Sequence, residues 1–186
     1  MPRVELVPVE QMPSEAQKII REGQAAGWIN STIYLQILGN NSDVLLMKLR
    51  EIKRRWHFGI IEPRLTELLR LRGAQLLGCE PCAGSRKERA LISEEDVACL
   101  YEPRPGGLSD RETVAIRFLE KIALDHFSVD DAFYRELAAH FTAAEVVEMG
   151  EYIAWIVGSQ SWAHTLDQFG DGPPIIRSTL ARSAIL

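Results

Sequence analysis

The sequence lacks several features that would place it in a membrane or secreted class. No apolar run approaches the roughly 20 residues needed to span a bilayer. The opening MPRVELVPVEQMPSEAQ has neither the basic start nor the apolar stretch of a signal peptide. Repeats and low-complexity tracts are missing as well. We therefore expect a cytoplasmic protein with no membrane partner.

Positive charge is also in short supply. The chain has 21 Lys and Arg residues against 26 Asp and Glu residues, a formal net charge of −5. Nucleic-acid binding needs a basic face that neutralises phosphates. The short basic cluster KLREIKRR at 48–55 is typical of a solvated helix face. We therefore expect no nucleic-acid partner.

Cysteine is scarce, with three in 186 residues. Cytoplasmic thiols are kept reduced, so a framework of structural disulfides is not expected. Cys79 and Cys82 lie three apart in GCEPCAGSR, whereas Cys99 follows Val97 and Ala98 and is expected to be a small buried hydrophobic residue. The C-x-x-C spacing leaves three alternatives: a metal clip, two ordinary core cysteines or a redox pair.

The remaining ligand set favours the redox pair. A structural zinc site needs four ligands. The sequence has no second C-x-x-C and no H-x₃₋₅-H, and its histidines are far apart. Cysteines near the start of a helix are more reactive than ordinary cysteines, because the positive helix end and its free N–H groups favour the nucleophilic thiolate. The sequence therefore predicts a redox pair with no metal and no other cofactor.

Helical periodicity lies between nearly all the proline, glycine and capping signals. Strand-length alternation is confined to the first nine residues. These patterns predict one all-α domain over 1–186, with helices at 14–25, 42–58, 63–77, about 80–91, a short segment after Ser93, 110–126, 131–141 and 143–168. The last helix is apolar around its circumference, so we expect it in the domain centre or against another subunit.

The central segment EPRLTELLRLRGAQLLGCEPC places Glu67 twelve residues before Cys79, in a Leu-rich helix. With this E-x₁₁-C-x-x-C pattern, the chain resembles the alkylhydroperoxidase-like branch of the carboxymuconolactone decarboxylase family. The segments MPRVELVPVEQMPSEA, GLSDRETVAIRFLEKIALD and FTAAEVVEMGEYIAWIVGSQSWAHTL are similar to further parts of that family, so the resemblance covers most of the chain. It implies a helical bundle that assembles as a homo-oligomer, a trimer or hexamer.

The resemblance also implies roles for individual residues. Cys82 would attack an alkyl hydroperoxide, Cys79 would resolve the sulfenic acid as a disulfide, and Glu67 would act as the base. A thioredoxin-like or lipoyl-type dithiol would then reduce the disulfide. The family's relay histidine is replaced here by Arg86, which does not release its proton in proteins. Without that relay, weak peroxidase activity is expected. Arg86 could stabilise the thiolate, pair with Glu67, or lie on an exposed helix face.

Two other functions stay open. The family's other branch implies a cofactor-free decarboxylase or isomerase of a small carboxylated lactone, in which Arg86 would bind a carboxylate. That branch usually lacks the cysteine pair. A non-catalytic binding subunit would fit the loss of the histidine. His164 and His57 are candidate accessory residues that would replace it, unless they are ordinary core or surface histidines.

Overall fold

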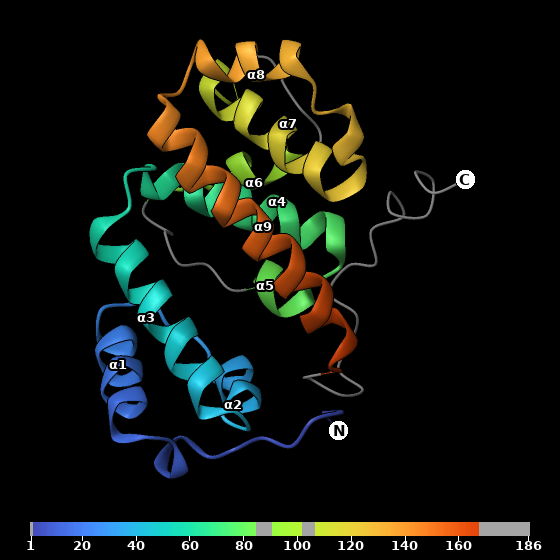
Figure 1. Ribbon diagram of the computed structural model, residues 1–186. Helices are drawn as coiled ribbons and strands as arrows, with labels where there is room; N and C mark the ends of the chain where they lie inside the picture. Colours follow the sequence, from blue (N-terminus) through green and yellow to red (C-terminus); the bar gives the residue numbers. More distant parts are fainter. Residues whose placement is uncertain (1, 85–90, 102–106, 168–186) are drawn as a thin grey trace. The chain divides into compact units, whose positions relative to one another are not determined.

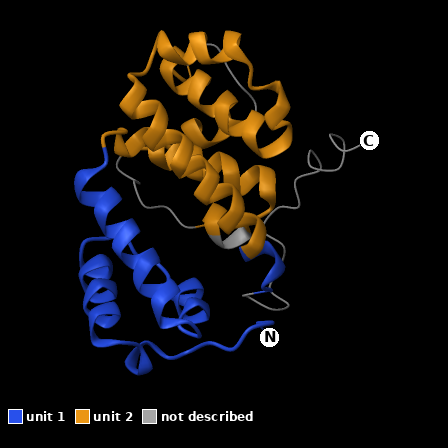
Figure 2. Ribbon diagram, viewed as in Figure 1, with its two compact units in different colours: residues 1–59, 85–87, 163–173 blue, residues 60–84, 88–162, 174–186 orange. Residues whose placement is uncertain are grey.

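The computed structural model describes residues 2–84, 91–101 and 107–167. Every regular element within these ranges is a helix, as Figure 1 shows, so the predicted all-α fold is confirmed. The chain divides into two compact units, coloured separately in Figure 2. Unit 1 holds the described residues 2–59 and 163–167, and unit 2 holds 60–84, 91–101 and 107–162. The expected single domain over 1–186 stays a prediction.

Unit 1 is built on three α-helices and a short 3₁₀ turn. These are η1 (Val9–Gln11), α1 (Ser14–Ala25), α2 (Ile33–Leu38) and α3 (Ser42–Phe58). Helices α1 and α2 pack against α3 around a core that includes Ile20, Trp28 and Leu49. The sequence analysis did not predict α2, which is only six residues long.

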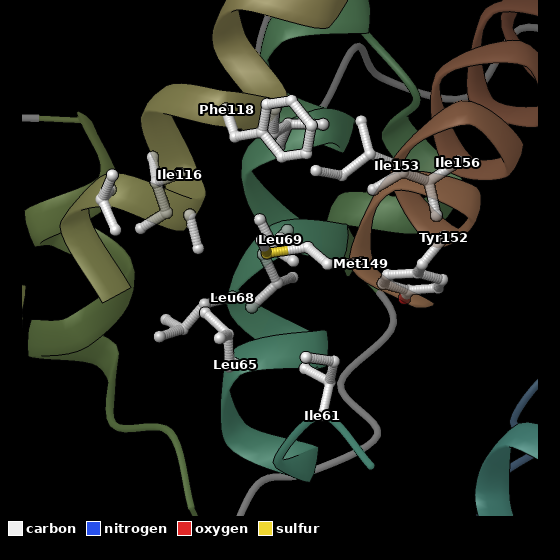
Figure 3. Close-up of a cluster of buried hydrophobic side chains, with 14 of the residues drawn as sticks. Ile61, Leu65, Leu68, Leu69, Ile116, Phe118, Met149, Tyr152, Ile153 and Ile156 are labelled. Atoms are coloured by element: carbon white, nitrogen blue, oxygen red, sulfur yellow. The ribbon is translucent and has the colours of Figure 1, made fainter. Parts of the chain in front are cut away.

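Unit 2 contains the remaining elements. They are α4 (Pro63–Leu77), α5 (Glu80–Gly84), α6 (Glu94–Tyr101), α7 (Asp110–Leu124), η2 (His126–Ser128), α8 (Asp131–Ala138) and α9 (Ala143–Thr165), whose last three residues fall in unit 1. Helix α4 contacts α5, α6 and α7, and α8 packs on α7. Figure 3 shows Leu65 and Leu69 of α4 in one apolar cluster with Met149 and Ile153 of α9. This core fixes the helix that carries Glu67.

Reciprocal caps explain where several helices begin. The side chain of Ser109 accepts a hydrogen bond from the Glu112 N–H, and the Glu112 carboxylate accepts one from the Ser109 N–H. Ser93 and Asp96 exchange the same pair of bonds before α6. Helix α3 begins at residue 42 as predicted, and the side chain that caps it is that of Asn41, which accepts a hydrogen bond from the Val44 N–H.

Helices α1, α3 and α4 end where predicted, at Ala25, Phe58 and Leu77, whereas α7 and α8 do not. Helix α7 stops at Leu124, earlier than the expected 126, because Asp125 leaves the helical region with φ −157°. Helix α8 ends at Ala138 rather than 141. The predicted extension of α5 to Leu91 falls on 85–90, outside the described residues.

Helix α9 has a buried side and an exposed side. Met149, Ile153 and Ile156 are buried, whereas Val147 is 66% exposed and Trp162 is 43% exposed. Packing in the domain centre therefore accounts for one side of α9 only, and the expected burial against another subunit stays a prediction. None of the helices in the described ranges is long and apolar enough to cross a membrane.

Candidate redox site

The turn between α4 and α5 places the cysteine pair. Gly78 ends α4 in the left-handed region, with φ +66°, where a residue without Cβ is least strained. The N–H groups of Gly78 and Cys79 both donate to the Ala74 carbonyl oxygen, which satisfies the helix end. The chain therefore reverses directly before Cys79, as the stop signal at Gly78 predicts.

Cys79 and Cys82 are joined by a disulfide, with their Cα atoms 5.3 Å apart. The Ala83 N–H donates to the Cys79 carbonyl oxygen at 2.9 Å, so the pair spans one helical turn. Cys79 is fully buried, whereas Cys82 is partly exposed. A solvent-borne reagent would therefore meet Cys82 first.

Glu67 lies on α4 in a buried ion pair with Arg70. The Arg70 Nε and Nη2 atoms donate to the two carboxylate oxygens at 2.7 and 2.6 Å. Both residues are more than nine-tenths buried, at 3% and 6% exposed. Their i, i+3 spacing puts them on one face of the helix. This two-pronged geometry is the strong form of an arginine–carboxylate pair.

Arg70 also contacts the redox pair. Its remaining terminal nitrogen, Nη1, donates to the Cys82 carbonyl oxygen at 2.5 Å. Arg70 therefore links the two features, because its one side chain binds both the Glu67 carboxylate and the Cys82 peptide.

Gln160 of α9 forms a hydrogen bond with the backbone of Arg70. The Gln160 Nε2 donates to the Arg70 carbonyl oxygen at 2.9 Å, and this bond is buried. A Cβ at Gly73 would lie 2.5 Å from the Gln160 Oε1. Glycine at this position therefore allows the glutamine to approach α4 closely enough to make the bond.

The structure does not test the roles predicted for the other site residues. Arg86 lies outside the described residues. His57 and His164 belong to unit 1, whereas Glu67 and both cysteines belong to unit 2. His57 contacts the ring of Trp28 edge-on, with centroids 6.5 Å apart. Accessory roles for the two histidines stay predictions.

Sequence reasoning missed Arg70, Gly73 and Gln160. The E-x-x-R spacing in a Leu-rich helix was a usable signal, because charges three apart on an apolar helix are placed to pair. A glycine inside a helical pattern costs about 1 kcal/mol relative to alanine, which indicates a packing reason. Gln160 was detectable only as a polar residue in an otherwise apolar helix.

Cys99 is buried and its thiol is free, as expected of a small core residue. Within the described ranges no group of three or more His, Cys, Asp or Glu side chains is placed to hold a metal ion.

A solved structure of a cysteine-to-alanine variant of the debrominase Bmp8, in complex with 2,3,4-tribromopyrrole, has a similar fold. The TM-score is 0.72 at 16% sequence identity, over 98% of this chain and 95% of that chain. No protein-family model matches the sequence, and no curated protein matches it either. At this identity the likeness concerns the fold, and it agrees with the predicted type of helical bundle.

Proposed function

We propose that the protein is a thiol oxidoreductase that reduces hydroperoxides through Cys82, with Cys79 as the resolving thiol. The observation that carries the proposal is the disulfide between a buried cysteine and a partly exposed one. Such a pair can divide the two tasks, because Cys82 is the residue accessible to a substrate and the buried Cys79 is the residue bonded to it. The E-x₁₁-C-x-x-C pattern points the same way.

The reaction balances over two steps. The Cys82 thiolate attacks the outer oxygen of the hydroperoxide and becomes a sulfenic acid, while the alcohol leaves after taking up a proton. The Cys79 thiol then displaces the hydroxyl, releasing water and closing the disulfide. A dithiol of the thioredoxin or lipoyl type returns two electrons and two protons by exchange, and is itself oxidised to a disulfide.

Slow turnover is part of the proposal. The position four residues after Cys82 holds Arg86, which cannot relay a proton to the leaving oxygen. General acid–base help is typically worth about 10² to 10⁴ in rate. Arg70 already binds both Glu67 oxygens, so Glu67 as a base would have to use its remaining lone pairs.

Reductive dehalogenation is the second candidate, and the fold likeness to a debrominase favours it. Two thiols and a brominated aromatic compound would give the debrominated compound, hydrogen bromide and a disulfide. The same two cysteines would be oxidised. A brominated pyrrole is therefore a necessary second substrate in any assay.

The test follows free thiols in the fully reduced protein on a Cys99→Ala background. Addition of one equivalent of an organic hydroperoxide should remove both thiols and form the Cys79–Cys82 disulfide. Cys79→Ser should instead accumulate a sulfenic acid at Cys82, which dimedone traps. Cys82→Ser should show no fast reaction.

The outcomes separate the candidates. Thiol loss with a brominated pyrrole but not with a hydroperoxide would replace the peroxidase proposal with dehalogenation. Thiols inert to both substrates would favour the decarboxylase, isomerase or binding-subunit alternatives. A sulfenic acid that forms at Cys79 in Cys82→Ser as fast as at Cys82 in Cys79→Ser would reverse the assigned roles.

A further inference from the structure

The buried ion pair of Arg70 and Glu67 is oriented, with its positive and negative ends on different sides. The Nε and Nη2 atoms of Arg70 face the carboxylate of Glu67 at 2.7 and 2.6 Å, so the negative charge lies on that side. Nη1 faces away from the carboxylate and donates to the Cys82 carbonyl oxygen at 2.5 Å. The pair is neutral as a whole, but its positive end is turned toward Cys82.

The guanidinium end of the ion pair lies close to the place where reduction of the disulfide creates a negative charge, the Cys82 thiolate. Four covalent bonds join the carbonyl oxygen of a cysteine to its Sγ, so the two atoms are within about 5 Å of each other. Glu67 and Arg70 are buried, and buried charges are screened much less than exposed ones. A nearby arginine favours the thiolate, and stabilising the reduced form makes a disulfide a stronger oxidant.

Arg70 is held in this orientation from both sides. Gln160 donates to its backbone carbonyl at 2.9 Å, and Glu67 binds its guanidinium with two hydrogen bonds. We propose that Arg70 is a positioning residue that fixes the Cys82 peptide against α4, directs the positive end of the buried pair at the reduced cysteine, and so makes the disulfide easier to reduce. This inference rests on the proposed thiol chemistry and adds a residue to which the sequence resemblance gives no role.

The test measures the equilibrium between the protein and glutathione. One Cys79–Cys82 disulfide and two glutathione thiols give two protein thiols and one glutathione disulfide, so two electrons pass to the protein. Arg70→Met with Glu67→Gln removes both charges together and keeps the site neutral. We expect this double variant to lower the equilibrium constant for reduction about tenfold, which is about 30 mV for a two-electron couple.

A single variant should raise the equilibrium constant for reduction, the opposite of the change expected for the double variant. Glu67→Gln leaves the Arg70 charge without its balancing carboxylate, so the reduced form should gain stability and the equilibrium constant should rise about tenfold. A purely structural role for the pair would not produce opposite shifts. The double variant is the safer one to fold, because Arg70→Met alone would remove the cation that binds the buried Glu67 carboxylate.

Arg72 supplies the matched control. It lies on the same helix and pairs with Glu120, with Nε to Oε1 at 2.7 Å, and Arg72→Met should leave the equilibrium constant unchanged. The inference is overturned if the double variant and Glu67→Gln both stay within about threefold of the unaltered protein, or if they shift in the same direction. A disulfide that neither glutathione nor a dithiol of the lipoyl type reduces in the unaltered protein would overturn the proposed function, and this inference with it.

Discussion

At the scale of single residues, Gly73 is the position where α4 has least room. A Cβ there would meet the Gln160 Oε1 at 2.5 Å and the Ile156 Cδ1 at 3.5 Å. Gln160 is 3% exposed and its Nε2 is bound to the Arg70 carbonyl oxygen. The glutamine therefore cannot swing away from a new methyl group without breaking a buried hydrogen bond.

We predict that Gly73→Ala lowers the free energy of unfolding by about 1–3 kcal/mol, the cost of an unsatisfied buried polar group or of overpacking. Urea unfolding would measure this change. The matched control is Gly150→Ala in α9, where a Cβ would come no closer than 4.0 Å to Phe118. That variant should gain about 0.5–1 kcal/mol, because alanine loses less entropy in a helix. Equal effects at both glycines would contradict the packing argument.

At the scale of helices, the sequence predicts most starts and the ends of α1, α3 and α4, but not the ends of α7 and α8. Capping signals at Ser93, Ser109 and Asp130 are local, so the hydrogen bonds they form can be read from residues three apart. The end of α7 depends on the turn that follows at Asp125, and the short α2 has no capping side-chain bond to mark it. Apart from α2, the helices of the described residues were therefore predictable, while the ends of α7 and α8 depended on the turns that follow them.

The candidate site shows the same division. Glu67, Cys79 and Cys82 could be predicted as a site because their spacing lies within one segment of the sequence. The disulfide confirms that the two cysteines are in contact. Gln160 lies ninety residues from Arg70 in the sequence and reaches it only because α9 packs on α4. No local pattern encodes such a contact, so this half of the site could not be predicted.

Carboxylates at the starts of helices make the stability of the fold sensitive to acid. At the start of α9 the N–H and hydroxyl of Thr142 donate to Glu145, and these bonds, with Arg111, lower its pKa from 4.5 to about 2. Hydrogen bonds from Arg64 hold the pKa of Asp96 well below its usual range. Carboxylates with depressed pKa values stabilise the fold above their unfolded pKa, and this contribution is lost as the pH falls through the folded pKa.

We therefore predict that the free energy of unfolding falls as the pH drops from about 4.5 toward 2, the window set by the shifted pKa of Glu145. Urea unfolding at a series of pH values would measure it. Glu145→Gln keeps a hydrogen-bond acceptor for Thr142 but removes the titrating group, so its stability should depend less on pH in this window. An acid profile identical to that of the unaltered protein would refute the assignment.

At the scale of the whole molecule, the exposed side of α9 is the feature that a monomer leaves unexplained. Val147, Ala154 and Gly158 are exposed and lie at i, i+7 and i+11, which places them on one face of the helix. Small residues on such a face allow another helix to approach closely. This face is where we place the subunit interface expected from the apolar character of the helix.

We predict that light scattering at micromolar concentration gives a mass several times the 20.9 kDa of one chain. Val147→Glu should lower that mass, because a carboxylate brought into an apolar interface loses its hydration without gaining a partner. Phe127→Glu is the control: Phe127 is 87% exposed but lies in η2, which packs on α7, so the assembly should survive. A mass of one chain for the unaltered protein would refute the oligomer, and an assembly that tolerates Val147→Glu would move the interface elsewhere.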